Sequence, residues 1–306
     1  MTELDAQRFT IHSGEVRPGV SLAWIREGVG GTPLLLLHGF PETKRIWWRN
    51  IEPLVEAGFE VIVPDLRGFG DSPMAADGFS DTAAYSRDVA ALVRDVLGHE
   101  RCVAAAGDLG GVVMYDLGLR FPGLIGSQCF FNSVPPALGR AAYTAAGVID
   151  DFATMNLATA DYFLRQGSDA DGLAAELDTR ARRLAYISEF YGHRLWAAAN
   201  TFDADSIRFH AEPFADERAF RTSIAAYEPA LKAVPISEPA MFRSPNPIPT
   251  LVLFGPEDHV VPPSFAARCA VAFTDCVGPF VVQGAGHFLQ WEQAELFNRA
   301  ISAFLR

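Results

Sequence analysis

Cysteine is scarce in this 306-residue chain, and the few that occur are not arranged as metal ligands. The four cysteines are Cys102, Cys129, Cys269 and Cys276, with no CxxC pair and no His/Cys cluster. So few isolated cysteines in a chain of this length argue against a disulfide framework. We therefore expect reduced thiols in an intracellular protein, with no metal and no other cofactor.

Basic residues are also in the minority. Lys and Arg number 25 against 37 Asp and Glu, which gives a formal net charge of -12 at pH 7. Nucleic acids and anionic membrane surfaces attract basic patches, so this balance argues against both as partners. A small neutral molecule is the expected partner. The sequence leaves the oligomeric state open between a monomer and a homodimer.

Long apolar runs are absent too. No stretch reaches the roughly 18 apolar residues that a membrane-spanning helix needs. The first residues, MTELDAQRF, include acidic side chains and have no apolar core of the kind found in a secretory signal peptide. These features predict a cytoplasmic protein without a membrane partner.

The apolar pattern predicts strands that alternate with helices along most of the chain. Strands are expected at 9–12, 22–27, 34–37, 60–64, 102–106, 125–132, 250–255 and 279–283. A helix is expected over residues 81–98, where apolar side chains recur at helical spacing between a possible N-cap, Asp81, and a terminating Gly98. This alternation is typical of a mostly parallel sheet with helices on both faces.

A change of character marks an insertion in the second half of the chain. From Pro135 to the proline-rich stretch 244–249, about a hundred residues show helical periodicity and no convincing strand. We therefore expect a core domain at 1–134, an all-helical lid at 135–245 and the rest of the core at 246–306. Such a lid would lie above the strand ends, where open sheets bind ligands.

An acidic residue, Asp108, stands where a strand-like run meets a helix-like segment. Small residues at Ala106 and Gly110 would allow a sharp turn there. Such elbows lift a nucleophile into a pocket, so the pattern predicts a carboxylate nucleophile. The alternative is a helix cap, because Asp is favoured just before a helix. No GxSxG motif occurs, which argues against an ordinary esterase.

Two later strand-to-turn junctions carry the residues that would complete a catalytic triad. Asp258 follows the strand expected at 250–255, and His287 lies in a glycine-rich turn after the last expected strand. The order Asp108, Asp258, His287 is nucleophile, acid and histidine, as in α/β-hydrolases. The loop at 38–41 follows another buried-type strand and could supply half of an oxyanion hole.

The core contains the segments HGFPETKRIWWRNIEPLVEAGFEVIVPDLRGFGDS, GDLGG, FGPEDHVVP and GAGHFLQWEQ. Together they resemble the epoxide hydrolases of the α/β-hydrolase superfamily. The resemblance implies an α/β-hydrolase fold with a mostly parallel eight-stranded sheet. It also implies that Asp108 is the nucleophile, Asp258 the charge-relay acid and His287 the general base. The oxyanion donors would be the backbone N–H groups of Phe40 and Leu109.

The implied reaction converts an epoxide and water to a vicinal diol. The Asp108 carboxylate would attack an sp3 carbon and become an ester. Water activated by His287, with Asp258 fixing its tautomer, would then hydrolyse the ester. A lid tyrosine would donate to the epoxide oxygen, and the segment AFRTSIAAYE resembles the lid segment that carries one such donor, which points to Tyr227.

The lid and pocket depart from the family pattern. The family usually has a second lid donor, but this chain matches that region poorly, and Thr159, Tyr162, Tyr191 and His193 stay open as alternatives. Leu109 stands where the family commonly has tryptophan, which removes an aromatic wall. The candidates for the pocket lining are His38, Pro41, Trp47, Trp48, Thr159, Tyr162 and Phe288, although core packing is an equal alternative for the two tryptophans.

Two other functions stay open. A haloalkane or haloacid dehalogenase would use the same aspartyl ester. However, Leu109 and Phe40 have no indole N–H to hold a halide, and Leu109 and Val112 stand where arginines would bind a haloacid. The alternative of another class is a non-catalytic protein of this fold that binds a small apolar ligand under its lid.

Overall fold

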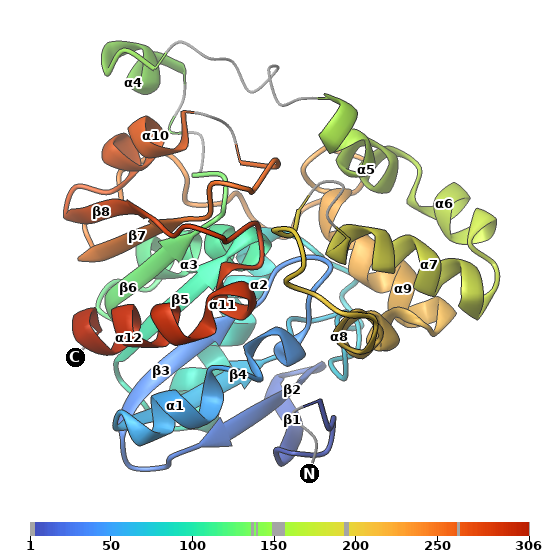
Figure 1. Ribbon diagram of the computed structural model, residues 1–306, viewed down its shortest axis with the longest axis horizontal. Helices are drawn as coiled ribbons and strands as arrows, with labels where there is room; N and C mark the ends of the chain where they lie inside the picture. Colours follow the sequence, from blue (N-terminus) through green and yellow to red (C-terminus); the bar gives the residue numbers. More distant parts are fainter. Residues whose placement is uncertain are drawn as a thin grey trace.

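The centre of the molecule is a sheet of eight strands in the order β1-β2-β4-β3-β5-β6-β7-β8 (Figure 1). The computed structural model describes residues 4–135, 138, 140–148, 157–192, 196–261 and 264–305. β1 pairs with β2, and β2 with β4, in antiparallel fashion, and all other neighbours are parallel. The predicted α/β fold with a mostly parallel eight-stranded sheet is confirmed. The strands are β1 (Ile11–Arg17), β2 (Val20–Glu27), β3 (Thr32–Leu37), β4 (Phe59–Pro64), β5 (Cys102–Gly107), β6 (Ile125–Phe131), β7 (Thr250–Phe254) and β8 (Cys276–Val281).

The first and last strands differ most from the prediction. β1 begins and ends later than the expected 9–12, and β8 begins and ends earlier than the expected 279–283. Both are edge strands with many exposed side chains, so neither carries the apolar run of a buried strand. The central strand β3 does carry one, because Leu34 to Leu37 are completely buried.

Helices cover both faces of the sheet. α1 (Ile51–Glu56) and α12 (Ala294–Phe304) contact each other on one face, and α2 (Thr82–Ala91) and α3 (Asp108–Arg120) pack together on the other (Figure 1). The expected helix at 81–98 is confirmed: the Asp81 carboxylate caps it, a π-helical turn, η2 (Leu92–Val96), extends it, and Gly98 follows with a positive φ angle. The remaining core helices are η1 (Lys44–Trp47), α10 (Phe265–Ala272) and α11 (Leu289–Glu292).

Between β6 and β7 the described residues form helices and no strand of the sheet. α4 (Arg140–Ala145) lies near α10, whereas the helices that we call the lid helices, α5 to α9, gather on the other side of the molecule (Figure 1). Hydrogen bonds from Arg45 to the Phe209 carbonyl and from Thr222 to the Gly68 carbonyl tie the lid helices to core loops. The lid helices are α5 (Leu157–Ser168), α6 (Ala170–Glu176), α7 (Arg180–Tyr191), α8 (Ala204–Ala211) and α9 (Glu217–Ile224), with the 3-10 turns η4 (Glu212–Phe214) and η5 (Ala225–Tyr227).

Candidate active site

Asp108 lies at a strained turn between β5 and α3. Its φ angle is 45°, in the left-handed region that a non-glycine residue rarely adopts. The turn closes tightly on the neighbouring strand, since a Cβ atom at Gly110 would come within 2.6 Å of the His38 carbonyl oxygen. Gly107 is the N-cap residue of α3, and no side chain caps this helix. The capping alternative for Asp108 is therefore wrong, and the sharp turn expected at this position is present.

The loop after β3 reaches the Asp108 carboxylate from the other side. The backbone N–H of Phe40 donates a hydrogen bond of 2.7 Å to Asp108 Oδ1. The approach is so close that a Cβ atom at Gly39 would lie 2.4 Å from the same oxygen. Below the loop, the buried Glu42 carboxylate accepts from the Gly39 N–H at 2.5 Å and from the Gln290 amide at 2.8 Å. The loop is thereby held with one backbone donor aimed at the carboxylate.

His287 lies between the two aspartates. Its Nδ1 is 2.8 Å from Asp258 Oδ2, and its Nε2 is 3.5 Å from Asp108 Oδ2. Asp258 is oriented in turn by the backbone N–H groups of Val260 and Val261, which donate to its Oδ1 at 2.8 and 3.2 Å. Burial alone would lower the pKa of His287, but the charges and hydrogen bonds of both aspartates raise it well above its usual range. The geometry is that of a base held by one carboxylate and directed at another.

Two phenols from the lid helices cover this carboxylate. Tyr227 of η5 and Tyr162 of α5 are both buried, with ring centroids 5.7 Å apart and planes at 89°. Both rings contact Phe40. Burial raises the pKa of each tyrosine well above its usual range, and the nearby Asp108 carboxylate raises both pKa values further. Both hydroxyls therefore stay protonated near neutral pH and can act as donors.

Tyr162 and Tyr227 line a cavity of 610 Å³. Asp108 and Leu109 also form part of its wall. Most of its wall is apolar, and those residues include Val112, Val134, Phe163, Leu164, Pro229, Ile236, Phe242 and Val260. Two charged residues on the wall, Asp81 and Glu238, are bonded to other protein groups. Asp81 accepts from Ser237, and Glu238 forms ion pairs with Arg87 and Arg120. The cavity thus suits a neutral, largely apolar molecule.

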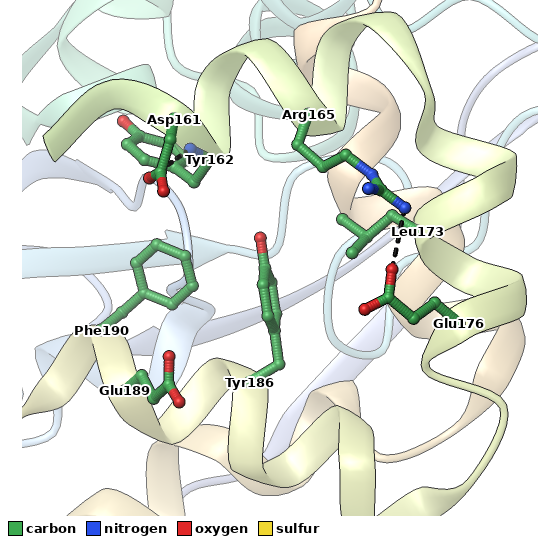
Figure 2. A pocket seen from close by; sticks show the side chains of 8 residues that line it. All are labelled: Asp161, Tyr162, Arg165, Leu173, Glu176, Tyr186, Glu189 and Phe190. Atoms are coloured by element: carbon green, nitrogen blue, oxygen red, sulfur yellow. Dashed lines mark hydrogen bonds and ion pairs between the residues drawn. The ribbon is translucent and has the colours of Figure 1, made fainter. Parts of the chain in front are cut away.

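Tyr162 also borders a second, smaller hollow within the lid helices. This hollow of 370 Å³ lies between α5 and α7, and Figure 2 shows Tyr186 and Phe190 of α7 opposite Tyr162 of α5. Its rim carries charged side chains, including an ion pair between Arg165 and Glu176. Tyr162 therefore lines both this hollow, with its charged rim, and the apolar cavity above Asp108.

The structure corrects several predicted pocket residues. His38 faces away from the cavity, because its Nδ1 bonds to the Gly39 carbonyl and its Nε2 accepts from the Leu66 N–H. Trp47 packs in the core between aromatic rings of β6 and α12. The Trp48 indole donates to the Asp5 carbonyl. None of the three lines the cavity, so the pocket assignment is wrong for them and core packing accounts for each.

Two further pocket assignments, to Pro41 and Phe288, are also wrong. The carbonyl of Pro41 accepts a hydrogen bond from the Tyr191 hydroxyl, and the Phe288 ring stacks on Tyr191 at 4.7 Å. The same hydrogen bond occupies Tyr191, which removes it from the possible second donors. His193 and the side chain of Thr159 lie outside the described residues. Tyr162 is the described candidate that faces Tyr227.

Sequence reasoning missed two buried neighbours of the triad. Trp196 packs its ring against the His287 ring at 4.3 Å, and its carbonyl accepts from the His287 N–H at 2.6 Å. Asn132, just after β6, bonds to the loops around the triad. Asparagine is common in ordinary turns, so its place at the end of a strand predicts a loop and does not indicate a link to the triad.

The described part of the chain has neither a metal-binding cluster nor a membrane-spanning helix. No group of three or more His, Cys, Asp or Glu side chains is arranged to hold a metal ion. No helix there combines the length and apolar character required to cross a bilayer.

Comparison with known proteins identifies the family. A family model described as the alpha/beta hydrolase fold matches residues 32–294. Epoxide hydrolase 4 of Mus musculus is 23% identical over 295 residues, which cover 94% of this chain and 77% of the relative. A haloalkane dehalogenase of Bradyrhizobium diazoefficiens is 26% identical over 302 residues, which cover 94% and 91%. The solved structure of epoxide hydrolase CorEH without ligand superposes with a TM-score of 0.82 at 21% identity, covering 97% of this chain and 98% of that one. Since the family model spans most of the sequence, the chain belongs to the alpha/beta hydrolase fold family.

Proposed function

We propose that this protein is an epoxide hydrolase that forms a vicinal diol through an ester on Asp108. One observation carries the proposal: a carboxylate lies at the base of an apolar cavity between a backbone donor, a histidine and two buried phenols. The relatives named epoxide hydrolases add support. A neutral, apolar epoxide fits a cavity wall whose charged groups already have partners.

In the first half-reaction, the Asp108 carboxylate attacks an epoxide carbon as the ring C–O bond breaks. Negative charge develops on the departing oxygen, which is an alkoxide and a poor leaving group. A proton from Tyr227 or Tyr162 passes to that oxygen and leaves a tyrosinate. The raised pKa values of both phenols keep the proton in place until the alkoxide forms.

Ester formation also prepares the base. In the resting protein the charges of Asp258 and Asp108 both raise the pKa of His287 and favour its protonated form. Once Asp108 becomes a neutral ester, its contribution disappears and the pKa of His287 falls, so that the imidazolium releases its proton to solvent and becomes a neutral base. The imidazole therefore becomes able to accept a proton from water only when the covalent intermediate has formed.

In the second half-reaction, His287 takes a proton from water and the resulting hydroxide attacks the ester carbonyl carbon. The Phe40 N–H, 2.7 Å from Asp108 Oδ1, stabilises the oxyanion together with the adjacent Leu109 N–H. Each such donor contributes about 3 kcal/mol in serine enzymes. Collapse releases the diol, whose oxygen receives the His287 proton. The remaining water proton leaves Asp108 and restores the tyrosine.

A haloalkane dehalogenase is the second candidate, because one relative carries that name. The two phenols favour the epoxide reaction, since a departing alkoxide needs a proton and a halide does not. Leu109, next to the nucleophile, offers no side-chain N–H to a halide. A purely ligand-binding protein would need neither the strained elbow nor the histidine between two carboxylates.

Styrene oxide and 1-chlorohexane distinguish these functions. The purified protein should convert styrene oxide to its diol and release no chloride from 1-chlorohexane, and Asp108→Asn should lose the diol activity while keeping its fold. Chloride release without diol would establish the dehalogenase. If the protein bound these compounds and turned over neither, the result would indicate a non-catalytic ligand-binding protein and overturn the proposal.

A further inference from the structure

Asn132 is a completely buried side chain that contacts the loops of all three triad residues. It is the first residue after β6, between the strand that leads to Asp108 and the strand that leads to Asp258. It does not line the cavity and cannot touch a substrate there. Its effect must therefore pass through the residues that it holds.

The hydrogen bonds of Asn132 reach three separate loops. Its carbonyl oxygen accepts from the Asp108 N–H at 3.2 Å. Its side-chain Oδ1 accepts from the Gly255 N–H at 2.9 Å, and the Gly255 carbonyl accepts from the Asp258 N–H at 3.1 Å. Its Nδ2 donates to the carbonyls of Gly286 and His287 at 2.6 and 3.1 Å. One residue thus sets the spacing of nucleophile, acid and base.

The chemistry of the amide group is matched to these partners. The backbone N–H of Gly255 requires an acceptor, which the amide oxygen supplies. The carbonyl oxygens of Gly286 and His287 require a donor, which the amide nitrogen supplies. An aspartate at the same place would turn a carboxylate oxygen toward those carbonyls. The backbone adds a second requirement, because the φ angle of Asn132 is 38° and asparagine tolerates this region better than most residues.

We infer that Asn132 is a positioning residue whose side chain holds the His287–Asp258 pair in register with Asp108. The inference extends the proposed function and rests on it for its kinetic consequence. Ester formation requires Asp108 and the lid phenols, and the Asn132 side chain bonds to none of them. Ester hydrolysis requires His287 and Asp258, which lie on the two loops that the side chain joins. Loss of the side chain should therefore slow the second half-reaction more than the first.

Two variants test this role against a matched control. Asn132→Asp keeps the acceptor for Gly255 and removes the donor, and Asn132→Gly removes the whole side chain while allowing the positive φ angle. The control is Gln128→Glu, the same amide-to-acid change on β6, the strand that Asn132 follows. Gln128 is equally buried and donates to the Thr250 hydroxyl at 2.9 Å, away from the triad.

Three measurements apply to each variant: rapid-quench rates of ester formation and decay with styrene oxide, the imidazole NMR titration of 15N-labelled His287, and the melting temperature. We expect ester decay to fall roughly 10- to 100-fold in both Asn132 variants, as a misplacement of about 1 Å would cause. Ester formation should change much less, the covalent ester should accumulate, and the apparent pKa of His287 should fall. Gln128→Glu should change the melting temperature only.

The inference is overturned if both Asn132 variants slow the two steps equally, or if the His287 titration stays unchanged in the variants that fold. Failure of the proposed function has a different signature. If the unaltered protein forms no ester from an epoxide, yet the His287 titration shifts in both Asn132 variants and not in Gln128→Glu, the epoxide reaction is refuted and the positioning role stands.

Discussion

Removal of the Tyr227 hydroxyl should slow ester formation and leave ester hydrolysis nearly unchanged. Tyr227→Phe keeps the ring, whose centroid lies 5.3 Å from that of Phe40, 5.7 Å from Tyr162 and 5.3 Å from Phe163. The proposed donor to the developing alkoxide is lost together with its hydrogen bond to Tyr162, while the packing of the lid against the core should persist. The effect then measures the hydroxyl alone.

The magnitude follows from the surroundings of the hydroxyl. Tyr227 is 8% exposed, so its donor acts in a site with little water, where one donor to a developing oxyanion contributes about 3 kcal/mol. Since about 1.4 kcal/mol corresponds to a factor of ten, ester formation should slow about 100-fold. Tyr162 remains as a second donor, so activity should persist. The double variant with Tyr162→Phe should be slower than either single variant.

Rapid-quench mass spectrometry with styrene oxide measures both steps, because the ester adds the substrate mass to the protein. Tyr186→Phe is the control: it removes a lid phenol whose hydroxyl accepts from Gln166 and which does not line the cavity above Asp108. This control should react like the unaltered protein. If Tyr227→Phe slowed formation and decay of the ester by the same factor, or if Tyr186→Phe matched its effect, the donor role of Tyr227 would be refuted.

Three other changes test different parts of the account. His287→Gln should block ester hydrolysis and trap the substrate mass on the Asp108 peptide after proteolysis; normal turnover without this adduct would identify another base. Burial raises the pKa of Glu42 to about 7. Between the usual glutamate pKa and pH 7, the folded protein therefore keeps a proton on Glu42 that the unfolded chain releases. The free energy of unfolding falls as pH rises through this range. Glu42→Gln, which keeps an acceptor for Gly39 and a partner for Gln290, should therefore gain roughly 2 to 3 kcal/mol in urea unfolding at pH 8 relative to pH 5, and an equal change at both pH values would contradict the assignment. Burial also holds the pKa of His210 well below its usual range, and no acceptor bonds to its ring nitrogens among the described residues. The unfolded chain binds a proton there below pH ~6.5, so stability is lost as pH falls; His210→Phe should flatten this acid limb of the melting temperature, and an unchanged limb would refute the reasoning.

Much of the core was predictable because its signals are local. The run of four leucines from Leu34 to Leu37 predicts a central strand, and these side chains are completely buried. The small residues around Asp108 predict a sharp turn. Asp258 and His287 each follow a strand near its carboxyl end, and parallel strands bring such ends to one edge of a sheet. The chain order of these residues was therefore enough to expect that they meet.

Features that depend on distant packing could not be read from the sequence. The aromatic character of Trp47 and Trp48 fits a pocket wall as well as a core, and only the contacts with Phe297 and Phe209 decide between them. The role of Asn132 was hidden for a similar reason. Its side-chain partners lie 123 to 155 residues further along the chain, so no local pattern links them.

The edge strands show the same limit. β8 has exposed positions along most of its length, and Phe280 and Val281 are both more than half exposed. Such a strand lacks the alternation of a half-buried strand and the continuous run of a fully buried one. Its start was therefore placed too late, although the histidine turn that follows it was identified.

A single turnover in 18O-labelled water tests the central claim most directly. If water attacks an ester on Asp108, the first diol should carry no label, and one labelled oxygen should appear in the peptide that contains Asp108. Label in the diol from the first turnover, with none in that peptide, would mean that water attacks the epoxide directly, and it would contradict covalent catalysis by Asp108.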